Sequence, residues 1–142
     1  MIQQMDSAPP FPPIEHVALT VSDLDRSIEW YTRLFGTAPT YRSVMLDGTR
    51  HQYEMAVWRQ PNFGLHHFAG GPRDPSDERR PGLDHVAFGC ADPAEVERWA
   101  SRLDELGIAR SEILREPYGV GLDVRDPDNI ALEFFASARR AA

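Results

Sequence analysis

The chain has 142 residues, 42% of them hydrophobic and 26% charged, a composition typical of one globular domain. Its formal net charge of −7 opposes binding to nucleic-acid phosphates, so no nucleic-acid partner is expected. No apolar run is long enough to cross a bilayer, and the first residues lack the pattern of a secretory signal. We therefore expect a cytoplasmic protein without a membrane partner. The single cysteine, Cys90, excludes an internal disulfide and is expected to be a small buried residue.

The first half of the chain predicts a strand followed by a helix. Residues 1–13 are rich in proline and are expected to form a flexible tail. Residues 14–21 then alternate between large apolar side chains and small or polar ones, which predicts a strand with two different faces. Ser22 or Asp23 offers an N-cap for the helix that follows, and Gly36 offers its C-terminal stop.

Short strands and a linker complete this half. Strand-like runs are found at 40–46, 51–58 and 63–68. Asp47-Gly48 predicts a hairpin turn between the first two runs. The segment 70–81 is rich in glycine, proline and charge, and is expected to be a linker.

The second half repeats this order. A strand is predicted over 83–90, and a helix from the N-cap Asp92 to the stop at Gly107. Strand-like runs follow at 110–115, 119–125 and 130–135. Residues 137–142 are expected to form a C-terminal tail.

The two halves align residue by residue. His16 falls on His85 at an offset of 69 (85 minus 16), and His66 falls on Glu133 at an offset of 67 (133 minus 66). A repeat of this length indicates a duplicated half-domain rather than a solenoid unit. We therefore predict an α+β fold with two tandem βαβββ modules, residues 14–69 and 82–136, within a single domain, 14–136.

The alignment brings four potential metal ligands to equivalent strand positions. His16 and His85 lie opposite in parity to the large apolar residues of their strands, and Glu133 lies opposite to its apolar neighbours. By the same parity, His66 rather than His67 shares the Glu133 face. Two histidines and a carboxylate suit a divalent ion, namely Fe, Mn, Ni, Co or Zn. The alternative is that these histidines are ordinary core residues with satisfied hydrogen bonds.

The sequence resembles a known superfamily from residue 14 to residue 135. The matching segments are IEHVALTVSDLDRSIEWYTRLFG, LDHVAFGCADPAEVERW and YGVGLDVRDPDNIALEFF. They are similar to the vicinal oxygen chelate superfamily, which includes glyoxalase I, extradiol dioxygenases and the fosfomycin and bleomycin resistance proteins. The resemblance implies sheets curled into a cupped, partly open barrel with helices outside. It also implies metal ligands at His16, His66, His85 and Glu133.

A metal-dependent enzyme is the function that we predict. Its substrate would be a small oxygenated molecule that chelates the metal through adjacent oxygens, and the reaction that of a lyase, isomerase or oxygenase. Glu133 or His66 would act as the catalytic base. The resemblance names no single reaction, because His66 stands where glyoxalase I members usually carry glutamate. The alternative is a non-catalytic small-molecule binder, such as an antibiotic-sequestering resistance protein.

Further residues and a second copy of the chain are expected to complete the site. Tyr53, Trp58, Arg115 and Tyr118 are candidates to line the cup. The resemblance also implies a homodimer. Some similar proteins exchange modules so that each site is built from both chains, and the sequence leaves open whether this chain does so.

Overall fold

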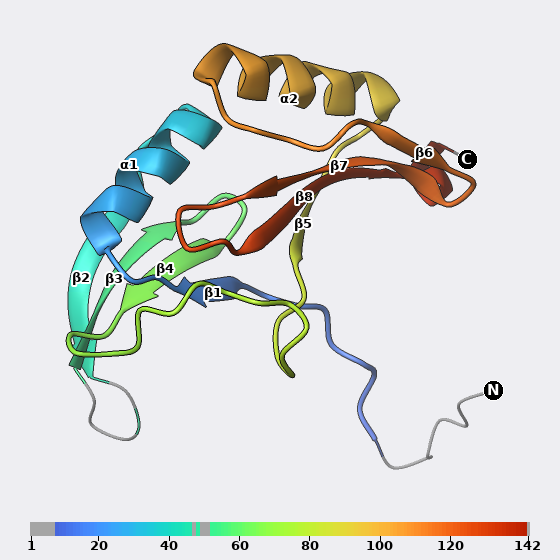
Figure 1. Cartoon of the computed structure of the whole chain (residues 1–142). Coiled ribbons are helices and arrows are strands. Elements are labelled where there is room, and N and C mark those ends of the chain that lie inside the picture. Colours follow the sequence, from blue (N-terminus) through green and yellow to red (C-terminus); the bar gives the residue numbers. More distant parts are fainter. Residues whose placement is uncertain (1–7, 47, 49–51, 142) are drawn as a thin grey trace.

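The computed structural model of the protein describes residues 8–46, 48 and 52–141 (Figure 1). The first module contains β1 (Val17–Thr20), α1 (Leu24–Phe35), β2 (Tyr41–Leu46), β3 (Gln52–Trp58) and β4 (Phe63–His67). The second contains β5 (Val86–Gly89), α2 (Pro93–Leu106), β6 (Leu114–Glu116), β7 (Gly119–Arg125) and β8 (Ala131–Ser137). A short 3-10 helix (Ala138–Ala141) follows. The predicted βαβββ order is therefore confirmed in both modules.

The described strands form two four-stranded mixed sheets rather than a closed barrel. Their orders, β1-β4-β3-β2 and β5-β8-β7-β6, are the same when the modules are superimposed in sequence. In each module the first and last strands pair in parallel, and the other neighbours pair antiparallel. Both helices lie on the outer side of an open arch (Figure 1). The α+β class with two tandem modules and outer helices is confirmed.

The helices begin and end where their capping residues predict. The Asp23 carboxylate accepts the backbone N–H of Arg26 at 3.0 Å, so Asp23 rather than Ser22 is the N-cap of α1. The Asp92 carboxylate likewise accepts the N–H of Glu95, at 2.9 Å. Gly36 and Gly107 close the two helices with φ of 73° and 69°, a left-handed conformation that favours glycine.

Several strand bounds differ from the prediction; β1 and β5, for example, each begin three residues later than expected. The expected strand 110–115 is reduced to β6 because Ser111 replaces part of the ladder with a side-chain bond. Its hydroxyl accepts the Asp123 N–H at 2.8 Å, while its own N–H donates to the Asp123 carbonyl at 2.9 Å. At the other end, β8 continues to Ser137, which pairs with Gly119. Asp47 of the predicted hairpin turn and residues 1–7 of the predicted tail lie outside the described residues.

An aromatic cluster joins the two modules. Phe88 of β5 lies 5.3 Å from Phe35 and 5.6 Å from Phe63, measured between ring centroids, and both partners belong to the first module. On its other side, Phe88 lies 5.6 Å from Phe134 of β8. The helix-facing cores of both sheets are thus continuous. Burying such aromatic surface is the largest favourable contribution available to an interface of this kind.

The helix ends add a reciprocal pair of caps. Arg102 of α2 donates to the carbonyls of Leu34 and Arg33, at 3.2 and 2.6 Å, at the end of α1. Arg33 in turn donates to the carbonyl of Leu106, at 3.1 Å, at the end of α2. The two arginines are related by the repeat offset of 69 (102 minus 33), and the helix C-termini meet (Figure 1). The modules therefore obey an approximate two-fold relation inside one chain.

The turn between β7 and β8 locks the second module against the first. The Tyr31 hydroxyl donates to Asp126 Oδ2 at 2.7 Å, and Ser22 donates to Asp128 through both its backbone N–H and its hydroxyl. Asp126 Oδ1 accepts the N–H groups of Asp128 and Ile130, at 2.8 Å each. Burial, the largest cause, raises the pKa of Asp126, and these hydrogen bonds partly oppose that effect.

Among the described residues, no helix is both long and apolar enough to cross a membrane.

Replacing Tyr31 by phenylalanine should destabilise the protein by about 1–3 kcal/mol, because a buried carboxylate oxygen loses its hydroxyl donor. The free energy of unfolding, measured by urea titration, checks this. Tyr41→Phe is the matched control, because Tyr41 is 40% exposed. Equal losses for the two variants would show that the Tyr31–Asp126 bond contributes nothing specific to stability.

Candidate metal centre

The alternation predicted for the site-bearing strands is confirmed. On β1, Leu19 is buried while Ala18 and Thr20 are exposed, and Val21, directly after the strand, is buried again. On β8, Leu132, Phe134 and Ala136 are buried, and Glu133 between them is half-buried. The apolar faces pack under the helices, so the opposite faces carry the candidate ligands toward the open side of the arch.

The first module brings His16 and His66 to one pocket of about 380 Å³. Ala18, Met55 and Val57 give this pocket an apolar wall. The His66 ring stacks on Tyr53 with centroids 4.5 Å apart. Burial, the largest cause, lowers the pKa of His66, and the nearby His16 lowers it further. The two imidazoles thus form one half of the predicted ligand set.

The second module brings His85 and Glu133 near one another. Glu133 pairs in register with Ala87, two residues after His85, and with Asp123 on the neighbouring strand. A hydrogen bond with Asp84 is the main cause of a raised pKa of His85, and the charge of Glu133 adds to it. Burial raises the pKa of Glu133, and Asp123 raises it further. Asp123 was not predicted to lie near the site, because its proximity to Glu133 follows from the β7–β8 register alone.

Within the described part of one chain, no three His, Cys, Asp or Glu side chains lie close enough together to hold a metal ion. The four candidate ligands are instead divided into two pairs, which we call the His16/His66 pair and the His85/Glu133 pair. Each pair consists of two candidate donors from one module.

The structure also places the other histidines and aromatic residues that were considered for the site. His67 lies near the backbone directly after β1, with Nδ1 2.9 Å from the Val21 carbonyl oxygen. The prediction that Trp58 lines the cup is wrong: Trp58 is 2% exposed and donates to the Thr37 carbonyl, because its register partner is the core residue Phe63.

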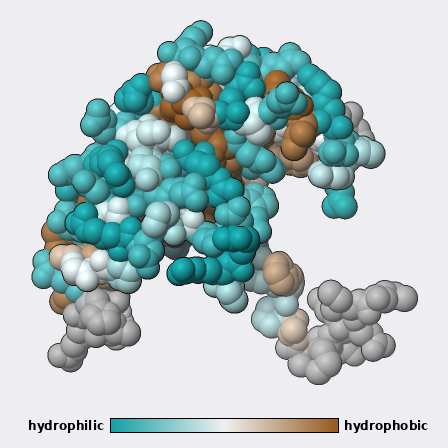
Figure 2. All heavy atoms as spheres, viewed as in Figure 1, coloured by the Kyte–Doolittle hydropathy of each residue, from teal (hydrophilic) through white to brown (hydrophobic). Residues whose placement is uncertain are grey.

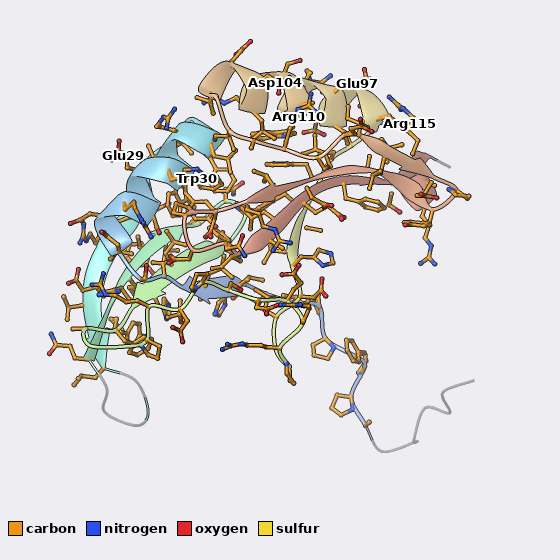
Figure 3. All side chains as sticks on the ribbon, viewed as in Figure 1. Glu29, Trp30, Glu97, Asp104, Arg110 and Arg115 are labelled. Atoms are coloured by element: carbon orange, nitrogen blue, oxygen red, sulfur yellow. The ribbon has the colours of Figure 1, made fainter. Side chains whose placement is uncertain are left out.

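The prediction that Arg115 lines the cup is also wrong. It donates to Glu97 of α2 at 2.7 Å, on the outer side of the arch (Figure 3). Tyr118 is 69% exposed and stacks on Phe135, whereas Tyr53 contacts His66 as expected for the cup. His51 lies outside the described residues.

Cys90 is a core residue, as predicted. Its side chain is buried, and burial raises its pKa to about 11. A buried thiol with a raised pKa does not supply a thiolate ligand or nucleophile at neutral pH. The candidate site is therefore built from imidazole and carboxylate groups alone.

The family model that matches this chain covers residues 13–134 and describes the glyoxalase/bleomycin resistance protein/dioxygenase superfamily. The chain therefore belongs to this superfamily, which confirms the resemblance to the vicinal oxygen chelate proteins. Among solved structures, a glyoxylase/bleomycin resistance protein/dioxygenase domain from Frankia sp. EAN1pec is 33% identical, with a TM-score of 0.73. The match covers 89% of this chain and 98% of that one.

Two further proteins are similar over part or all of the fold. A trivalent organoarsenical cleaving enzyme from Thermomonospora curvata is 33% identical over 96 residues, which are 68% of this chain and 56% of that protein. The chain thus spans about half the length of this curated relative. A fosfomycin resistance protein from Listeria monocytogenes, complexed with Mn(II) and sulfate, is 22% identical with a TM-score of 0.57, over 90% of this chain and 94% of that one. That likeness shows the fold alone.

The Cys90 thiol should not react with Ellman's reagent in the native protein, because it is buried and protonated. Titration of the native and denaturant-unfolded protein with the reagent checks this, and one thiol per chain should appear only after unfolding. Cys90→Ser provides the blank. Rapid reaction of the native protein would contradict the assignment of Cys90 to the core.

Proposed function

We propose that the chain is a divalent-metal-dependent enzyme that acts on a small oxygenated substrate, held through adjacent oxygens. The observation that carries this proposal is the placement of one donor pair on the inner face of each module. In the first module His66 pairs in register with Thr20, four residues after His16, and in the second Glu133 pairs with Ala87, two residues after His85. Imidazole and carboxylate donors without a thiolate suit Fe, Mn, Co, Ni or Zn. This donor set fits a metal ion once the two pairs are combined.

A homodimer with exchanged modules would combine them. The His16/His66 pair of one chain would face the His85/Glu133 pair of a second copy, and the reverse would hold at a second site. The side chains of His16 and His85 are 68% and 45% exposed in the single chain, which leaves both available to a partner. Closed two-fold dimers give each copy the same environment, so two equal sites would result.

The chain's own residues would divide the work of binding and proton transfer. A bound divalent ion would supply Lewis acidity toward the substrate oxygens. Glu133 would accept or return a proton at a carboxylate oxygen, with His66 as the other candidate for this role. The apolar wall at Ala18, Met55 and Val57 would exclude water from one side of the substrate.

The organoarsenical cleavage named for the relative from Thermomonospora curvata is not proposed for this chain. Trivalent arsenic is a soft centre that binds thiolates, and soft thiolate sites need accessible cysteines. This chain contains one cysteine, and it is buried in the core. The chemistry named for the relative from Thermomonospora curvata therefore has no matching thiol here.

Protein purified without chelators should hold about one divalent ion per chain, as expected for one complete site per exchanged module pair. His85→Ala should abolish tight binding, and His66→Ala should weaken it by about 10–100-fold or more. His67→Ala is the control, because His67 contacts the backbone directly after β1 instead of the pocket that holds His66. Elemental analysis and titration with Fe²⁺, Mn²⁺, Co²⁺, Ni²⁺ and Zn²⁺ provide the measurement. Absence of stoichiometric metal, or an equal loss for His67→Ala, would refute the assignment.

Mixing two variants that each lack one metal ligand tests the exchanged dimer. His16→Ala and Glu133→Ala chains, refolded together, should recover about one quarter of the metal sites by random pairing, because a mixed dimer places both intact modules at one site. His16→Ala mixed with His66→Ala is the control, since each of its sites keeps one defect. Recovery is measured as tightly bound metal. A monomeric mass in light scattering, or no recovery, would rule out exchange.

A further inference from the structure

Each of the two equivalent histidines has a carboxylate beside it in the chain. His16 Nδ1 contacts Glu15 Oε2, and His85 Nδ1 lies 2.7 Å from Asp84 Oδ1. Glu15 and Asp84 are themselves equivalent, at the same offset of 69 (84 minus 15). The contact is thus present once in each module and involves the same ring nitrogen.

The two carboxylates are held differently. The Asn62 amide donates to both the carbonyl and the Oε1 atom of Glu15, at 3.2 Å each. Asn62 lies directly before β4 and has a φ of 64°. Its equivalent Asn129, with φ of 62°, donates to the Ser76 carbonyl at 2.9 Å instead. Glu15 is therefore anchored by its own module, and the Asn62 side chain can be removed while its counterpart serves as a control.

In each contact the carboxylate determines which nitrogen of the imidazole ring carries the proton. A carboxylate accepts hydrogen bonds and cannot donate them, so the nitrogen that it contacts, Nδ1, must be the N–H group. The other nitrogen, Nε2, then keeps its lone pair. A second partner of this kind commonly fixes the tautomer and ring orientation of a metal-binding histidine.

We infer that Glu15 and Asp84 are positioning residues that hold His16 and His85 in the Nδ1–H tautomer, with Nε2 presented to a divalent cation. This inference rests on the proposed function for the identity of the ligand. The orientation itself rests on the contacts within the chain. Among the described residues, His66 has no carboxylate partner and stacks on Tyr53 instead. The carboxylate–histidine contact is therefore found just before the first strand of each module.

The tautomer can be measured in metal-free protein. Nitrogen-15 NMR of histidine-labelled protein, at a pH where the rings are neutral, should show His16 and His85 as Nδ1–H tautomers. Neutral imidazole in water favours the Nε2–H form instead. Glu15→Gln should return His16 toward that form, Asp84→Asn should do the same for His85, and each variant should leave the other histidine unchanged.

Metal affinity supplies the second measurement. Glu15→Gln and Asp84→Asn should each weaken Zn²⁺ binding by about 10–100-fold, the usual effect of losing such a partner. Glu29→Gln is the charge-matched control, because Glu29 projects from the outer face of α1 (Figure 3). Asn62→Gly should weaken binding less than Glu15→Gln, whereas Asn129→Gly should leave it unchanged. Glycine adopts the left-handed backbone at both positions, and a urea titration of each variant checks that the loss of the side-chain hydrogen bonds leaves the protein folded.

The two measurements separate the inference from the proposed function. Nε2–H tautomers in the unmodified protein would overturn the positioning role, as would variants that leave both tautomer and affinity unchanged. Unmodified protein with the Nδ1–H tautomers but without any Zn²⁺ binding would overturn the metal-dependent function while the orienting role stands.

Discussion

The contact between the two modules is the constraint on which the rest of the structure depends. Phe88 fills the space between Phe35, Phe63 and Phe134, so the apolar cores of the two sheets merge on the helix side. The turn carrying Asp126 and Asp128 then fastens the second module to the beginning and middle of α1. Because the modules are joined through their helix-facing cores, their inner faces remain open along the arch (Figures 1 and 2).

This way of joining the modules explains why the candidate ligands are separated into pairs. In each pair the histidine lies just before the first strand of one sheet, and the other donor lies on the last strand, which pairs with that first strand in parallel. The distance between the pairs is decided by the aromatic cluster and the helix caps instead. Each module of the single chain therefore holds one pair of candidate donors in place.

The two modules share equivalent contacts at their helix ends and turns. They differ at the turn through which the second module contacts α1 of the first. Arg33 and Arg102 exchange equivalent caps, and Asn62 and Asn129 share the left-handed conformation. The position equivalent to Asp126 is Arg59, which lies near Tyr41 with its Cζ atom 5.5 Å from the ring centroid. Only one of the two turns can bury an aspartate against Tyr31, so the duplicated halves are not interchangeable.

The sequence by itself determined the local structure and the candidate donors. Alternation placed His16, His85 and Glu133 opposite the buried faces, and the repeat aligned His66 with Glu133, because side chains on a strand change face at every residue. Tertiary structure decided what each residue meets. Trp58 entered the core, Arg115 turned outward to α2, and Asp123 came beside Glu133, since strand register and helix position link residues distant in the chain. It also decided that the four donors lie in two pairs, because the packing of one module on the other depends on contacts between side chains that no local pattern records.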